Sequence, residues 1–550
     1  MANRTAEQYI AIHKIEESNQ ANFRALWQET ADLEYPRDNQ IDKTSVPGVE
    51  KSNEIYDTTA VMDSISMTSG ISSAFIPSGQ LFFGLRARRK ELNAIDVCRR
   101  WMSMATQIAH EEMFESNLML QLNETLRSSI VFGTGNIYTD FNMRTGSLYY
   151  RDYSIGTYQL MEDESGFVDT IICKFKMTAR QAEQKFGDKL PDKIKKALEK
   201  PETENKEFDF LHFVEPRKNR NPKRKTNINM PVESVYIAVD DKQIVEESGY
   251  EEFPFATPRW AKSTVEKYGR GQGTEILPDV RVLQQLKKDF IECGNKWNNP
   301  ALQVLSSFEG RVRTIPGAQN IVEELGSIAS ISDGAKGSFP ITKDMLIFQQ
   351  DIIHKAFFKD VFEQLGDLKG DRRTTTEILE RINEGLQRLA LPVARLQSEL
   401  FNPLIKRTVL LLIRNGRIPY PPAELQGQGF GIEYRGRLAL ALRNQQSKAF
   451  QQWLAFVAQM DLVFTDQKPS DNIDSDGAVV RMGESLGVNI DDIASEVDRD
   501  QKRMARAQMM QAQMAAQAAQ IGADAINKTS NKPEAGSPAE AMMGQMGGEQ

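Results

Sequence analysis

Cysteine and long apolar runs are scarce in this chain of 550 residues. The three cysteines, Cys98, Cys173 and Cys293, are widely separated and odd in number, which indicates synthesis in a reducing cytoplasm. The longest strongly apolar run, Val409 to Ile413, is far too short to span a bilayer, so we expect no membrane segment. The polar N-terminus also lacks the apolar core of a secretion signal.

Motifs for metal binding and catalysis are missing too. The chain has no Gly-x-Ser-x-Gly elbow and no Walker loop, and no histidine is paired with another at metal-ligand spacing. We therefore expect no enzymatic activity, no metal site and no cofactor. The four histidines are His13, His110, His212 and His354, and we interpret His354 as a packing or interface residue.

Two stretches imitate known binding motifs without completing them. The segment "GRGQG", 269–273, lacks the last glycine of a dinucleotide fingerprint because Thr274 takes its place, so a backbone hinge is the favoured interpretation. The segment "NIDSDG", 472–477, resembles the start of an EF-hand, but Gly483 stands where a bidentate glutamate is required. A helix start capped by aspartate is the simpler interpretation.

Charge of one sign does not dominate the chain. The formal net charge of −8 argues against tight wrapping of nucleic acid, because phosphate binding depends on clustered lysine and arginine. It leaves transient contact with DNA open. One cluster stands out in "RKNRNPKRK": Arg217, Lys218, Arg220, Lys223, Arg224 and Lys225. Either it contacts nucleic acid or it is a solvated hairpin loop, and the loop is favoured because no aromatic side chains are interleaved for base stacking.

The pattern of apolar residues predicts a mainly helical α+β protein. Thr5 and Gln8 form a capping box at the start of a helix that we expect to run to Tyr35, and further helices are expected at 52–75 and 93–130. The β-branched and aromatic residues of 131–177 and 205–260 predict antiparallel strands, with a helix that begins at Thr178 between them.

A pair of amphipathic helices is expected in the middle of the chain. The first covers 275–299 and the second 343–365, and they flank 300–342, which has no helical periodicity. The apolar arc of the second helix is too wide for one partner. We expect it to contact the first helix on one side and a neighbouring subunit on the other.

A short basic loop follows this pair. It carries Lys369, Arg372 and Arg373, and Gly366 and Gly370 keep its backbone flexible. Thr374 and Glu377 then form a capping box that starts a helix of about forty residues. Pro392 and Pro403 lie within that helix, so it must bend or break there.

The C-terminal part is expected to contain short helices over 430–500 and a helix rich in Ala, Gln and Met over 498–521. Beyond Gly522 the composition predicts disorder.

Four segments together resemble the portal, or head-to-tail connector, proteins of short-tailed bacteriophages. They are "NEIYDTTAVMDSISMTSGISSAFIPSGQLFFGL" from Asn53, "SNLML" with "SSIVFGTGNIYTD" from Ser116, "PRWAKSTVEKYGRGQGTEILPDVRVLQ" from Pro258 and "TTTEILERINEGLQRLALPVARLQSELFNPLIKR" from Thr374. The resemblance covers most of the chain between Phe23 and Leu442.

The resemblance implies a portal fold that assembles as a ring, typically of twelve subunits, around a central channel. Its expected parts are a wing at 1–270, stem helix 1 at 271–299, a clip at 300–342, stem helix 2 at 343–365, a tunnel loop at 366–373, a long bent helix linking wing to crown at 374–429, a crown with the C-terminal helix at 430–521, and a disordered tail at 522–550.

The implied function is structural: a conduit for DNA packaging and ejection at one capsid vertex. The implied partners are double-stranded DNA, a terminase motor, a tail adaptor protein, and capsid and scaffolding proteins, with the segment 301–340 as the docking surface for motor and adaptor. The implied location is the virion, after assembly in the host cytoplasm.

Our hypothesis for the tunnel loop follows from the near neutrality expected of the stem helices. A conduit must hold DNA loosely. Lys369, Arg372 and Arg373 give the loop, but not the stem helices, a net positive charge, so we expect transient contact of the loop with DNA phosphates. A rival interpretation pairs these charges with neighbouring subunits. Two other functions stay open: an enzyme that processes nucleic acid, and a coiled-coil scaffold or effector without a pore.

Overall fold

The computed structural model describes residues 4–43, 48–77, 81–221, 223, 226–298, 301–304, 306, 311–315, 319–322, 328–330, 339–361, 388–435, 450, 452–460, 469–486 and 496–529. The chain falls into two compact units. Unit 1 comprises Met1–Arg86, Met104–Pro421 and Phe430–Ala449, and unit 2 comprises Ala87–Ser103, Pro422–Gly429 and Phe450–Gln550.

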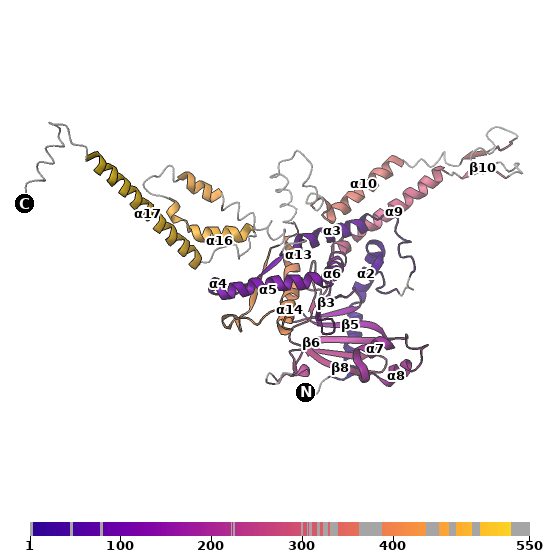
Figure 1. The fold of residues 1–550 in the computed structure, drawn as a ribbon. Helices are drawn as coiled ribbons and strands as arrows, with labels where there is room; N and C mark the ends of the chain where they lie inside the picture. The colour runs from indigo at the N-terminus through magenta and orange to yellow at the C-terminus, as the bar shows by residue number, and fades with distance from the viewer. Residues whose placement is uncertain are drawn as a thin grey trace, which may run out of the picture. The chain divides into compact units, whose positions relative to one another are not determined.

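The described elements confirm a mainly helical α+β protein (Figure 1). The helices are α1 Ala6–Asn19, α2 Ala21–Glu34, α3 Thr59–Phe75, α4 Lys90–Ala94, α5 Asp96–Glu115, α6 Leu118–Val131, α7 Ala179–Phe186, α8 Asp192–Leu198, α9 Gln272–Asn298, α10 Phe339–Ala356, α13 Ala390–Arg395, the π-helix η5 Leu396–Phe401, α14 Asn402–Arg414, α16 Ser475–Leu486 and α17 Glu496–Thr529. The strands are β1 Phe83–Ala87, β2 Ile137–Asn142, β3 Ser147–Asp152, β4 Tyr158–Glu162, β5 Val168–Thr178, β6 Glu207–Pro216, β7 Val232–Ala238, β8 Gln243–Tyr250, β9 Phe255–Ala256, β10 Leu302–Val304, β11 Ile328–Ser330 and β12 Phe430–Tyr434.

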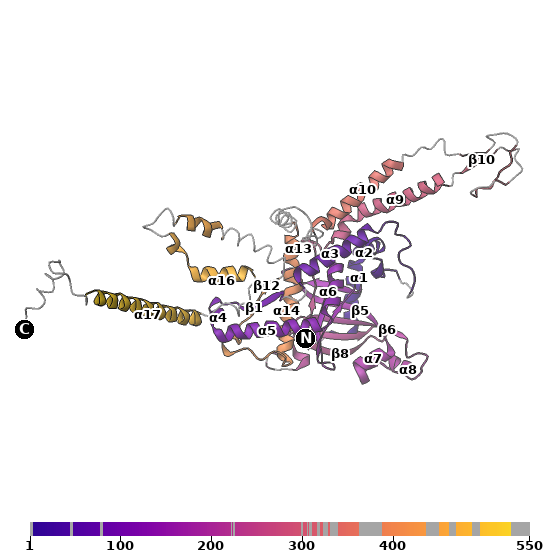
Figure 2. The same cartoon turned by 45° about the horizontal axis from the view of Figure 1, so that its top comes forward.

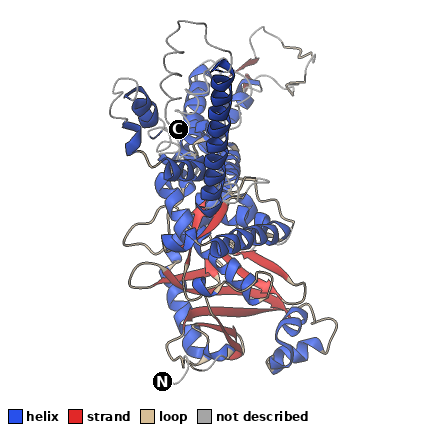
Figure 3. Cartoon of the chain, turned by 60° about the vertical axis from the view of Figure 1, so that its left-hand side comes forward, coloured by secondary structure: helices blue, strands red, loops and turns tan. Residues whose placement is uncertain are grey.

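A five-stranded antiparallel sheet, in the order β4-β5-β6-β7-β8, forms the strand-rich part of unit 1 (Figure 3). Alternate residues of β6 point to opposite faces, as the period of two requires. Leu211 and Phe213 pack against Tyr9 of α1 on one face, whereas Phe208 and Phe210 pack against α7 and α8 on the other. Both faces of the sheet are therefore covered by helices.

A second core joins α2 to this sheet and to the segment that leads into α9. Trp27 of α2 is fully buried, and its ring meets Tyr268 edge-on at 5.1 Å between centroids. The Tyr268 hydroxyl accepts a hydrogen bond from the backbone N–H of Leu160 in β4 at 3.1 Å. The start of α9 is thereby held against both α2 and the sheet.

Helices α9 and α10 lie side by side and form a hairpin that projects away from the sheets. Strand β10 lies at the far end of this hairpin (Figures 1 and 2). Strands β10 and β11 pair as a short antiparallel ribbon between the two helices in sequence. This confirms the predicted pair of helices.

The two prolines of the long helix flank a change in its hydrogen-bond pattern, and residues 390–414 stay helical where a bend or break was expected. Pro392 lies in α13 and Pro403 in the first turn of α14, and the turns between them form the π-helix η5. Proline lacks the N–H that a continuous α-helix needs, so the backbone changes its hydrogen-bond pattern here. Residues 362–387, which include the predicted start of this helix, lie outside the described residues.

Several predicted boundaries in the N-terminal half were wrong. The first helix is two helices separated at Gln20, the second begins only at Thr59, and 93–130 is divided among α4, α5 and α6. The sequence analysis missed α8, because its seven residues are too few for a clear apolar period. The predicted capping box at Thr5 is present, and the helix expected to begin at Thr178 also starts with a capping box, formed with Gln181. The capping box predicted at Thr374 and Glu377 lies outside the described residues.

Two predictions near the C-terminus also need correction. Residues 430–434 form strand β12, which pairs with β1, where short helices were expected. Helix α17 continues to Thr529, past the expected start of a disordered tail at Gly522, and Ala523 and Ala525 favour the helix in this extension. The rest of the expected tail, 530–550, lies outside the described residues.

Candidate functional site

The α9–α10 hairpin is held together by apolar and amide contacts. Leu283 of α9 and Ile353 of α10 are fully buried. The Gln349 side-chain amide of α10 donates to the Asp279 carboxylate of α9 at 2.8 Å and to its backbone carbonyl at 3.2 Å. Because this contact satisfies polar groups of both helices, it fixes their register.

Charge is balanced along the hairpin. Helix α9 carries four acidic and four basic residues, and α10 carries two of each besides His354. Some of these charges are paired: Arg281 of α9 donates to Glu29 of α2 through two nitrogens, and Lys287 lies 3.7 Å from the Asp57 carboxylate. The net formal charge of the two helices is therefore zero, so their surface should bind a polyanion only weakly.

Large apolar side chains remain exposed on the hairpin and on the neighbouring helix α3. Phe348 of α10 is 66% exposed and Met62 of α3 is 58% exposed. Several exposed apolar residues on a hairpin are typical of a protein–protein contact surface. The others are Ile65 of α3, Val282 and Ile291 of α9, and Met345 and Ile347 of α10.

The second predicted helix, 343–365, is interrupted earlier than expected. Helix α10 ends at Ala356, and Phe358 adopts a left-handed backbone with φ of 53° before a helical turn at 359–361. All the predicted tunnel-loop and cap residues, Gly366, Lys369, Gly370, Arg372, Arg373, Thr374 and Glu377, lie outside the described residues.

The predicted secondary basic surface lies in the connection between β6 and β7. Lys218, Arg220 and Lys223 are exposed, whereas the Arg217 side chain is only 4% exposed. Arg217 lies 2.9 Å from Glu247 and donates to the Ser248 carbonyl at 2.8 Å. Arg217 thus belongs to the sheet and not to the exposed part of the loop. Arg224 and Lys225 lie outside the described residues.

The pseudo-motif at 472–477 caps a helix. The Gly477 N–H donates to the Asp474 carboxylate at 3.0 Å at the start of α16, as an aspartate cap should. Asp476 instead pairs with Arg499 and Arg503 of α17. Within the described residues, no group of three or more His, Cys, Asp or Glu could hold a metal ion.

The four histidines lie apart, each with its own partner. Burial, together with the nearby charge of Arg435, lowers the pKa of His110 to about 4, so His110 is neutral at physiological pH. The partners are Gln159 for His13, the Phe82 N–H for His110, Ser234 for His212 and Asp63 for His354. Among the described helices, none is long and apolar enough to cross a bilayer.

The backbone of the segment "GRGQG" packs closely against the backbone at the end of α6, so the predicted hinge was wrong. A Cβ atom on Gly271 would lie 2.5 Å from the Gly133 nitrogen and 2.5 Å from the Val131 carbonyl oxygen. The Trp260 N–H donates to the Gly133 carbonyl at 2.9 Å. Glycine is needed here because the end of α6 and the root of α9 touch through their backbones.

Changing Gly271 to alanine should lower the free energy of unfolding by about 3 kcal/mol, since backbone atoms must move to admit the methyl group. Gly294, in the body of α9, is the matched control. A Cβ there meets nothing within 4 Å, so Gly294→Ala should raise stability by about 1 kcal/mol through helix propensity. Chemical denaturation measures both. Equal effects of the two changes would contradict the close-contact interpretation.

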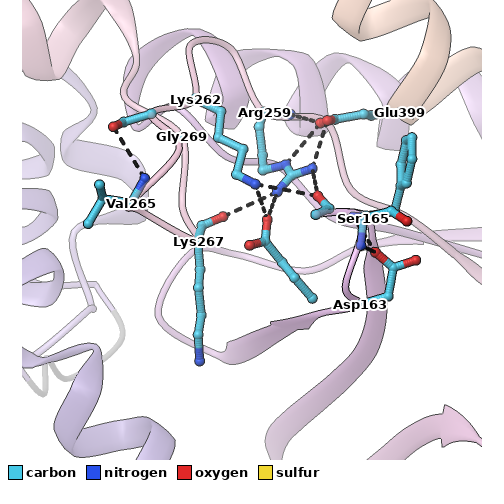
Figure 4. A network of polar contacts seen from close by, with 12 residues as sticks. Asp163, Ser165, Arg259, Lys262, Val265, Lys267, Gly269 and Glu399 are labelled. Atoms are coloured by element: carbon cyan, nitrogen blue, oxygen red, sulfur yellow. Dashed lines mark hydrogen bonds and ion pairs between the residues drawn. The ribbon is translucent and has the colours of Figure 1, made fainter.

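A buried polar network, which the sequence analysis missed, anchors the root of the hairpin (Figure 4). The Arg259 side chain is 2% exposed and donates to Glu399 of η5 at 2.7 and 3.1 Å. Arg259 also pairs with Glu162 at the end of β4 and donates to the Gly166 carbonyl at 3.0 Å. Lys262 adds a second pair to Glu162 at 2.5 Å. Three segments distant in sequence are thereby joined.

Glu34, at the end of α2, is a buried ionisable group near the first turn of α9. Its side chain is fully buried, both carboxylate oxygens lack a hydrogen-bond partner, and one lies against Gly273. Burial alone raises the pKa of Glu34 from its ordinary value near 4.5 to about 8. Glu34 is therefore mostly protonated at neutral pH.

Comparison with known proteins identifies the family. The profile of the bacteriophage head-to-tail connecting proteins matches residues 6–493, and the chain belongs to this family. It is 28% identical to the portal protein of Salmonella phage epsilon15 over 529 residues, 93% of each chain. It is 27% identical to a protein of Bordetella phage BPP-1 named "probable portal protein" over 527 residues, 92% of each chain.

Proposed function

We propose that copies of this chain assemble into a ring at one vertex of a phage head, and that DNA passes through the ring during packaging and ejection. The main support is the α9–α10 hairpin, which combines balanced charge with exposed apolar side chains. In a ring, the apolar side chains would be covered by the neighbouring copies, and the balanced charges would face a mobile polyanion.

The parts of the chain have distinct roles in this proposal. Helices α9 and α10 are the stem, and the β10–β11 ribbon belongs to the clip at the far end of the hairpin (Figure 1). The clip is the proposed docking surface for the terminase motor and later for the tail adaptor. Its exposed Ile315 and Ile321, at 72% and 92%, suit such a contact. The assembled ring is a structural component of the virion, with twelve subunits as the expected number.

The tunnel loop is proposed to contact DNA transiently through Lys369, Arg372 and Arg373. Changing all three to alanine should leave rings intact and reduce the yield of DNA-filled particles about tenfold, because the phosphate contacts that guide or retain the genome are lost. Changing Lys218, Arg220 and Lys223 to alanine is the matched control, since it removes the same charge from another loop.

Negative-stain microscopy of the purified protein and particle counts in a complementation assay measure these effects. Rings with a central opening are expected for the native chain and for both variants. A compact monomer or an elongated bundle without a pore would overturn the proposed function. An unchanged yield of filled particles with the tunnel-loop variant would overturn the role of the loop alone.

A further inference from the structure

The chain breaks its helical path directly after α10. The Phe357 N–H still donates to the Ile353 carbonyl at 3.0 Å, but Phe358 has φ of 53° and its N–H donates to Lys355 at 3.2 Å. The Val361 N–H then donates to the Phe358 carbonyl at 3.0 Å. A left-handed backbone is unfavourable for a bulky side chain, so surrounding contacts must stabilise this turn.

One buried carboxylate contacts both sides of the break. Asp63 of α3 is 2% exposed; one of its oxygens accepts a hydrogen bond from His354 Nδ1, before the break. The other oxygen lies 3.5 Å from Lys359 Nζ, after the break. Ile353, Phe357 and Val361, which precede and follow the break, are also buried. The carboxylate thus joins two residues whose relative position depends on the turn at Phe358.

The returning chain is tied to the same turn. Arg388, where the described chain resumes, lies 3.6 Å from the Asp360 carboxylate, and its guanidinium lies 5.5 Å from the centre of the Phe358 ring. Arg388 and Asp360 are both about half exposed, so this pair should contribute less to the stability of the turn than a buried pair would. The buried Asp63 is the stronger constraint.

We propose that Asp63 is a positioning residue: by bridging His354 and Lys359 it stabilises the strained turn at Phe358 and sets the direction in which the chain leaves α10. The proposal rests on the proposed function, because the chain that leaves α10 leads to the tunnel loop. The bridge itself can be tested without reference to DNA.

Hydrogen exchange of the backbone amides of Phe357, Phe358 and Val361 tests the bridge in the assembled full-length protein. Asp63→Asn keeps the shape of the side chain and removes its charge, so exchange at 357–361 should accelerate about tenfold. Asp57→Asn is the control, because Asp57 is also buried on the α3 side of α10 and accepts from Gln350 at 2.9 Å. It should leave exchange at 357–361 within about threefold of the native rate.

A rescue experiment separates positioning from general packing. Glycine adopts a positive φ without steric cost, so adding Phe358→Gly to Asp63→Asn should restore slow exchange at 357–361. Lys359→Met replaces a side chain that is 30% exposed and leaves Asp63 in place, and it should accelerate exchange there in the same direction if Asp63→Asn does not fold.

The outcomes distinguish this proposal from the proposed function. Faster exchange spread equally over 343–361 without rescue by glycine, or no change in any variant, would overturn the role of Asp63. If exchange responds as expected while filled particles form normally, the bridge stands and its relevance to packaging is refuted. If the protein forms no ring, the proposed function fails, and exchange at the turn still reports on the bridge.

Discussion

Replacing Arg259 by methionine is expected to lower the free energy of unfolding by about 3–5 kcal/mol. The change removes a guanidinium that satisfies Glu399 of η5, and leaves that carboxylate, 12% exposed, without its charged partner. Glu162 keeps Lys262 and should be affected less. Chemical denaturation followed by circular dichroism measures the loss.

Two variants define the cause of this loss. Arg259→Met combined with Glu399→Leu should recover a large part of the stability, because an apolar pair replaces a broken ion pair. Arg281→Met is the matched control, since Arg281 and Glu29 form an exposed pair at 51% and 43%, and its loss should cost less than about 1 kcal/mol. A similar cost at Arg281 and at Arg259 would contradict the importance of burial.

The contribution of Glu34 to the stability of the protein should fall as pH rises from about 4.5 to 8. His13, His110 and His212, whose pKa values burial lowers, make the opposite contribution up to about pH 6.5, so the Glu34 contribution is isolated by comparing the native protein with a Glu34 variant. Above pH 4.5 the unfolded chain releases the Glu34 proton, while the folded protein keeps it until about pH 8. At this carboxyl the unfolded state therefore binds fewer protons in this window, and the Glu34 contribution to the free energy of unfolding decreases by at most about 1.4 kcal/mol per pH unit. The total is on the order of a few kcal/mol.

Glu34→Gln removes this titration and should make the slope of the unfolding free energy against pH more positive by about one proton between pH 4.5 and 8. The variant should be more stable than the native protein at pH 8 and close to it at pH 5. Asp152, whose pKa burial raises to about 7, contributes in the same direction and should preserve part of the slope. A slope that is unchanged in Glu34→Gln would show that the carboxyl is ionised or solvated in the folded state.

Both predictions concern the place where the α9–α10 hairpin joins the rest of unit 1. The Arg259 network holds the segment before α9, and Glu34 lies against Gly273 in the first turn of that helix. Gly271 adds the backbone contact between α9 and the end of α6. These buried groups therefore fix the base of the α9–α10 hairpin, which the proposed conduit for DNA would require.

Local sequence patterns determined the type of most elements and the family. The capping boxes at Thr5 and Thr178, the alternating residues of β6 and the apolar period of α9 depend on neighbours in sequence, so each can be recognised without a tertiary structure. The four segments that resemble portal proteins led to the same family that the comparison identifies.

Only the tertiary structure shows which charged side chains are buried in ion pairs and which glycines pack closely against another backbone. Arg217 and Lys218 are adjacent and both basic, yet the first is buried beside Glu247 and the second is exposed. The glycines of "GRGQG" predict a hinge from sequence but pack closely against Gly133. Arg259, Glu34 and Asp63 carry no local signal beyond a charge among apolar neighbours. The physical reason is that burial and ion pairing depend on distant segments, from 30 residues away for Arg217 and Glu247 to 291 for Asp63 and His354, and no pattern of adjacent residues records them.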